Sequence, residues 1–147
     1  MKNTVKSLLC LSSLVLLQAC GPRGETKTLE QILDGAKSSF AQASRNQIAS
    51  PDIAKVLTDT VSKLDGALNL SANGDAQLGQ TLGQIGASLS QLTQNAGYTQ
   101  RPSLAELSTQ YRELAKGGAT ADNVKLLVAR SYTLLASELE TTKFGLK

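Results

Sequence analysis

Apolar side chains recur every three or four residues through most of the chain after residue 28, and this spacing limits the fold more than any other feature. An α-helix turns once in about 3.6 residues, so the spacing gathers these side chains on one face of each helix. No run combines the alternation of apolar and polar residues with the hairpin turns that would predict β-strands. We therefore expect an all-α fold, a small bundle of about five antiparallel amphipathic helices behind a short flexible tether.

Helix-capping residues indicate where the expected helices begin. Thr28 and Gln31 form a capping box, in which each side chain bonds the backbone N–H of the other residue, and Ser103 and Glu106 form a second. The stretch 71–74, Ser-Ala-Asn-Gly, has the composition of a turn. The helices are expected from Thr28, from Ser50-Pro51, from about Asp75 to Asn95, from Ser103, and from Thr120 to about Lys143.

The last expected helix has the widest apolar surface. Its main stripe comprises Val124, Leu127, Val128, Ser131, Leu135 and Leu139, and the residues that widen it are Leu126, Ala129, Tyr132 and Ala136. A face this broad indicates contact with two neighbouring helices. The first helix has a narrower face, formed by Leu29, Ile32, Leu33, Ala36, Phe40 and Ala43.

Three glycines interrupt the third expected helix. Gly79, Gly83 and Gly86 lie beside a seam of apolar residues, and each glycine inside a helix costs about 1 kcal/mol relative to alanine. Close approach by another helix of the same chain would offset this cost, and we favour that interpretation. Two alternatives are a surface for a partner helix or for self-association, and a helix that is simply bent or frayed. The seam consists of Leu78, Leu82, Ile85, Leu89 and Leu92.

The first nineteen residues have the layout of a secretory signal peptide. Lys2 and Lys6 give a positive start, and the apolar run over 8–17 is followed by small and polar residues. This run has signal-peptide length, whereas a membrane-spanning helix needs about twenty apolar residues. We therefore expect residues 1–19 to be removed.

The segment Leu17-Gln18-Ala19-Cys20 resembles the lipobox of bacterial lipoproteins. The resemblance implies cleavage between Ala19 and Cys20 and a covalent lipid on Cys20, which would anchor the protein to a membrane. Gly21 follows, where an aspartate would resemble an inner-membrane retention signal. The outer membrane, with the domain in the periplasm, is therefore favoured over the inner membrane, and the surface of a single-membrane cell is the alternative location. The chain is divided accordingly into a signal peptide (1–19), a lipidated tether (20–27) and a helical domain (28–147).

The rest of the composition argues against disulfides, metal sites and catalytic residues. The chain has no histidine, and its two cysteines fall in the signal peptide and at the lipidation site, so no disulfide, metal site or catalytic residue is expected. Loss of residues 1–19 removes two of fifteen basic side chains and none of twelve acids, leaving a formal net charge of +1. Nucleic acid is therefore not an expected partner. Glu106 and Glu113 could share a helix face, but carboxylates at this spacing are usually solvated.

These observations favour a non-enzymatic, membrane-anchored accessory protein that binds another envelope protein in secretion, pilus or surface assembly. In size and class the chain is similar to the helical secretion pilotins, although it lacks the disulfide that many of them carry. One alternative is a binding module for a hydrophobic or cell-wall ligand held between helices, with no cofactor beyond the lipid on Cys20. A carboxylate-based hydrolase ranks last, and self-association stays open.

Overall fold

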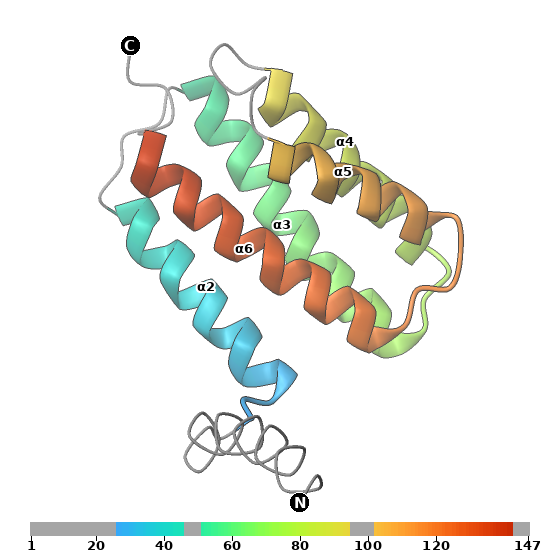
Figure 1. Ribbon diagram of the computed structural model, residues 1–147. Coiled ribbons are helices and arrows are strands. Elements are labelled where there is room, and N and C mark those ends of the chain that lie inside the picture. Colours follow the sequence, from blue (N-terminus) through green and yellow to red (C-terminus); the bar gives the residue numbers. More distant parts are fainter. Residues whose placement is uncertain (1–25, 46–50, 95–101, 143–147) are drawn as a thin grey trace, which may run out of the picture.

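The computed structural model describes residues 26–45, 51–94 and 102–142, and every regular element in these ranges is a helix (Figure 1). The predicted all-α fold is therefore confirmed. The signal peptide, the cleavage site at Ala19 and Cys20, and most of the tether lie outside the described residues. The helices are α2 (Leu29–Arg45), α3 (Pro51–Asn73), α4 (Leu78–Gln94), α5 (Pro102–Ala115) and α6 (Ala121–Thr142).

Helix α6 lies at the centre of the arrangement. It packs against α2, α3 and α5, which is one neighbour more than its broad apolar face had led us to expect. Helices α4 and α5 form a close pair, and α4 also packs against α3. Helices that follow one another through a short turn run antiparallel, as expected for short connections. In contrast, α2 and α6 lie side by side and run in the same direction, because no short turn links them (Figure 1).

The cap residues account for several helix boundaries. At α2, the Thr28 N–H donates to Gln31 Oε1 at 2.9 Å and the Gln31 N–H donates to Thr28 Oγ1 at 3.3 Å, so the predicted capping box is confirmed. At α6, Thr120 Oγ1 accepts a bond from the Asn123 N–H at 3.2 Å.

Three boundaries differ from the prediction. Helix α3 continues through Ser71, whose hydroxyl donates to a carbonyl of the preceding turn, and ends before Gly74, which adopts a φ of 64°. Helix α4 begins at Leu78 rather than near Asp75, and the Asp75 carboxylate instead accepts from the Gln77 N–H at 2.8 Å. Helix α5 begins at Pro102, so Ser103 lies inside the helix and not at its cap.

The interior is mainly aliphatic, with two buried tyrosines, Tyr111 and Tyr132, among the described residues. The Tyr111 hydroxyl bonds Ser131 Oγ at 2.8 Å, and that serine hydroxyl is also 2.8 Å from the Leu127 carbonyl oxygen of its own helix. Burial raises the pKa of Tyr111 above its ordinary value, because the charged phenolate would lose its hydration. The largest fully buried side chains are Tyr111, Leu64, Leu82, Ile85, Leu89, Leu92, Leu104, Leu107, Leu135, Val124 and Val128.

Two large apolar residues that the sequence assigned to buried faces are exposed. Ile32 on α2 is 41% exposed and Leu126 on α6 is 49% exposed. The prediction was wrong for both, because helical spacing shows which side chains share a face and not whether another helix covers it. Within the described ranges, no helix combines the length and the apolar character needed to cross a membrane.

Candidate functional site

The glycine stripe of α4 faces α5. A Cβ atom added to Gly86 would lie 3.0 Å from the Ser108 carbonyl oxygen, and one added to Gly79 would lie 3.1 Å from the Ala115 carbonyl oxygen. At Gly83 the fit is looser, with the Ala115 Cβ at 4.0 Å. The Ser108 hydroxyl donates to the Gly86 carbonyl oxygen at 2.7 Å across the same contact. Within the described chain, these glycines therefore let two backbones approach closely.

Glu106 and Glu113 lie on the outer side of α5. Glu113 pairs with Lys116 at 2.7 Å, and Glu106 accepts a hydrogen bond from the Gln110 side-chain amide at 2.8 Å. Both carboxylates are largely exposed and engaged in ordinary surface pairs. Among the described residues, no group of three or more acidic, histidine or cysteine side chains is arranged to hold a metal ion.

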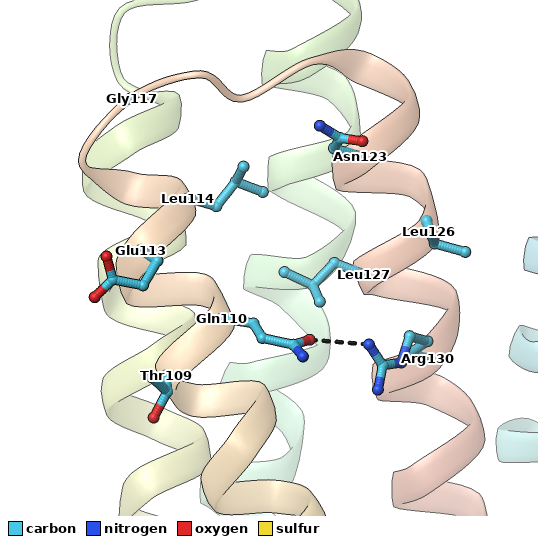
Figure 2. A pocket seen from close by; sticks show the side chains of 9 residues that line it. All are labelled: Thr109, Gln110, Glu113, Leu114, Gly117, Asn123, Leu126, Leu127 and Arg130. Carbon is cyan, nitrogen blue, oxygen red and sulfur yellow. Dashed lines mark hydrogen bonds between the residues drawn. The ribbon is translucent and has the colours of Figure 1, made fainter.

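An open surface lies along α6, where two adjoining cavities share Leu126 and Arg130. We call the two together the α6 groove. The larger cavity, of about 510 Å³, lies between α5 and α6 (Figure 2). The smaller, of about 310 Å³, extends to Ile32 on α2. The lining residues are Thr109, Gln110, Glu113, Leu114, Gly117, Asn123, Leu126, Leu127 and Arg130 in the first, and Ile32, Ser103, Glu106, Leu126, Ala129, Arg130, Thr133 and Leu134 in the second.

Helices α2 and α5 form the walls of the α6 groove, because both pack against α6 but have no close backbone contact with each other. The floor is a second stripe of α6, in which Leu126, Arg130 and Thr133 are exposed, Leu134 is partly buried against the core and Ala129 is buried. Its residues, at the helical spacing i, i+3, i+4, i+7 and i+8, are Leu126, Ala129, Arg130, Thr133 and Leu134.

Arg130 lies at the middle of this floor. Its Nη1 donates to Gln110 Oε1 at 3.0 Å, the bond drawn in Figure 2, and its Nη2 lies 3.8 Å from Glu106 Oε1. The first partner is a neutral amide, and the second is at the outer limit of an ion pair between half-exposed side chains. The guanidinium is thus held in place by α5 but only weakly neutralised.

A second, apolar groove separates α2 from α3, with Leu139 of α6 at its floor. Its volume is about 340 Å³, and it is lined by Phe40, Ser44, Ala54, Leu57, Thr58, Val61 and Leu139. The Thr58 hydroxyl donates to the carbonyl of Ala54, and that of Ser44 to the carbonyl of Ala41, so both are satisfied within their own helices. We call this the α2–α3 groove.

Next to the α2–α3 groove, one polar cluster ties three helices together. Asp65 Oδ1 of α3 receives the Lys37 ammonium of α2 at 2.6 Å and the Tyr132 hydroxyl of α6 at 3.0 Å. Lys37 Nζ also lies 5.6 Å from the centre of the Tyr132 ring, and Phe40 meets that ring edge to face. Burial, together with the neighbouring Asp65 carboxylate, raises the pKa of Tyr132.

Sequence reasoning missed both grooves. The pattern Leu126, Arg130, Leu134 was present as a signal, at steps of four beside the main stripe of the last helix.

Compared with protein-family models, with curated proteins and with solved structures, the chain matches none.

Proposed function

We propose that this chain is a non-enzymatic lipoprotein of the bacterial envelope that holds a partner protein close to the membrane. The observation that carries this proposal is the α6 groove, which exposes Ile32 and Leu126 around the half-exposed Arg130. Arginine is enriched among the hot spots of protein interfaces, and an exposed apolar patch with a polar rim is typical of an interaction surface. The lipobox-like segment ending at Cys20 supports the anchor, and Gly21 supports the outer membrane as its location.

The position of the α6 groove is consistent with that role. Ile32 belongs to the first turn of α2, and the ion pair between Glu30 and Lys125, at 3.1 Å, brings the start of α6 to the same end of the bundle. The eight peptide units from Cys20 to Thr28 span at most about 28 Å when fully extended. A partner in the groove would therefore lie near the anchored end of the domain.

The α2–α3 groove favours a second candidate function, a binding module for a small hydrophobic ligand. Its volume of about 340 Å³ is at the lower end of the range for small-molecule sites, and its lining is largely aliphatic and aromatic. Co-purification of a lipid with the full chain, and its loss in Val61→Trp, would support this candidate over protein binding.

Two measurements test the proposed function. Mass spectrometry of protein extracted from membranes of its host should show an acylated Cys20, and Cys20→Ala should release the protein from the membrane fraction. Affinity capture through the anchored domain should return one envelope protein in stoichiometric amount. Leu126→Asp should abolish that capture, whereas Ala87→Asp, an exposed position on α4, should not. An unmodified cysteine, or the absence of any captured envelope protein, would contradict the proposal, whereas equal capture by both variants would put the binding surface outside the α6 groove.

A further inference from the structure

We propose that the α6 groove binds an amphipathic helix of the partner, about three turns long, with an acidic side chain placed against Arg130. This inference rests on the proposed function and specifies the kind of partner. Three observations support it: the backbone groups of the groove floor are already hydrogen-bonded within α6, the floor has the length of a short helix, and the Arg130 guanidinium lies at its centre.

The backbone of the floor selects a helix over an extended segment. In the middle of α6 the N–H and C=O groups are already used in the helix itself, so the floor offers side chains alone. A strand or loop placed there would lose water from its own N–H and C=O groups without gaining partners. A helix satisfies these groups internally and needs only side-chain contacts, which is the helix-in-groove mode of recognition.

The dimensions of the floor match a short helix. From Asn123 to Leu134 the lining residues extend over eleven helical steps, about 17 Å at 1.5 Å per residue. Leu126, Arg130 and Leu134 form a ridge at steps of four, and such ridges pack into the grooves of a second helix.

The charge at the centre specifies one side chain of the partner. Arg130 has five N–H donors, and within the described structure it uses one on Gln110 and approaches Glu106 only at 3.8 Å. A carboxylate on the bound helix could form the bidentate pair that arginine favours. Glu106 and Glu113 on the α5 wall disfavour a second acid on that side of the bound helix.

The first experiment locates the partner segment. A photoreactive phenylalanine derivative replaces Leu126 in the full, membrane-anchored chain in its host, and the crosslinked peptide is sequenced by mass spectrometry. The expected segment has apolar residues at i, i+3 or i+4, and i+7, with one Asp or Glu on the same face. A crosslink to a loop, to a strand, to lipid or to a second copy of this chain would overturn the inference.

The second experiment tests the charge with a synthetic peptide of the crosslinked segment and the purified full chain. Arg130→Glu should weaken binding at least about tenfold, and exchange of the acid in the peptide for lysine should restore it. Lys55→Glu, on the exposed side of α3, is the matched control and should leave affinity unchanged. Equal loss in both variants, or no rescue, would overturn the inference.

Failure of this inference can be told apart from failure of the proposed function. If stoichiometric capture persists in Leu126→Asp while Cys20 is acylated, the protein is an anchored binding protein whose partner lies elsewhere, and the groove inference is wrong. If Cys20 is unmodified and no partner is captured, the proposed function is wrong as well.

Discussion

The α4–α5 contact and the α6 groove are both lined by one face of a helix, but only the first is closed. On α4 the glycines bring Gly86 so close to α5 that an added Cβ would be 3.0 Å from a carbonyl oxygen. On α6 the outer stripe bears Leu126, 49% exposed, between two walls that do not meet. Small residues thus mark a face whose neighbour is present, and large exposed ones mark a face without a neighbour among the described residues.

This comparison agrees with the sequence analysis for the α4 glycines and corrects it for the face around Leu126. Packing of the glycines against another helix of the same chain was the favoured interpretation, with a partner surface as an alternative, and Leu126 was assigned to the apolar surface that other helices would cover. Sequence shows that a helix face is unusual, but the presence of a neighbour depends on how the helices pack. Four predictions, in order of decreasing effect, test the difference between the closed contact and the open groove.

The largest effect is expected for Gly86→Leu. The Cβ atom of the new side chain would lie 3.0 Å from the Ser108 carbonyl oxygen and 3.1 Å from the Arg112 Cγ, which is closer than ordinary van der Waals contact. Helices α4 and α5 would therefore have to move apart. We expect a loss of about 3 kcal/mol in the free energy of unfolding, measured by urea denaturation. An unchanged midpoint with lost association would instead identify the glycine stripe as a partner surface.

The second prediction concerns alkaline pH. Tyr111 and Tyr132 both have a pKa raised by burial, whereas in the unfolded chain they ionise near about pH 10. Above that pH the unfolded state loses protons that the folded state retains, so stability must fall as pH rises. The slope should reach at most about 1.4 kcal/mol per pH unit for each tyrosine.

Urea midpoints between pH 8 and about 11 measure that slope, and the phenylalanine variants supply the control. Tyr111→Phe should flatten the decline most, since its hydroxyl lies in the closed interior beside Ser131. Tyr132→Phe should also flatten it. A decline that is the same in the wild type and both variants would show that other groups cause it.

Gly83→Ala should be mildly stabilising. Its added methyl group would be 4.0 Å from the Ala115 Cβ, an ordinary contact, and alanine improves helix propensity by up to about 1 kcal/mol. Gly79→Ala is the matched control, because there the methyl would be 3.1 Å from a carbonyl oxygen and the gain should disappear. An equal gain in the free energy of unfolding at both positions would mean that α5 does not pack closely against α4 at Gly79.

The smallest effect is expected in the open region. Leu126→Ala should change the free energy of unfolding by no more than about 0.5 kcal/mol, because the side chain is half exposed. Leu135→Ala, on the same helix but fully buried, should cost about 2–5 kcal/mol. If the two variants lose similar amounts in thermal and urea unfolding, the face around Leu126 is covered in solution.

Local features of the fold could be predicted and long-range ones could not. The capping box at Thr28 and the buried seam residues Leu82, Ile85, Leu89 and Leu92 depend on neighbours within a few residues, so the sequence displays them directly. The parallel pairing of α2 with α6 depends on contacts between distant parts of the chain. The same holds for the α6 groove, where Gln110 and Arg130 meet across two helices.

The pairing of α2 with α6 also has a consequence for the order in which the protein folds. Glu30 and Lys125 are 95 positions apart, so the earliest described helix obtains its main neighbour only after the latest one has been made. Contacts of such long sequence separation form slowly, because a large loop must close first. A growing chain would therefore leave α2 without its main neighbour until α6 has been made.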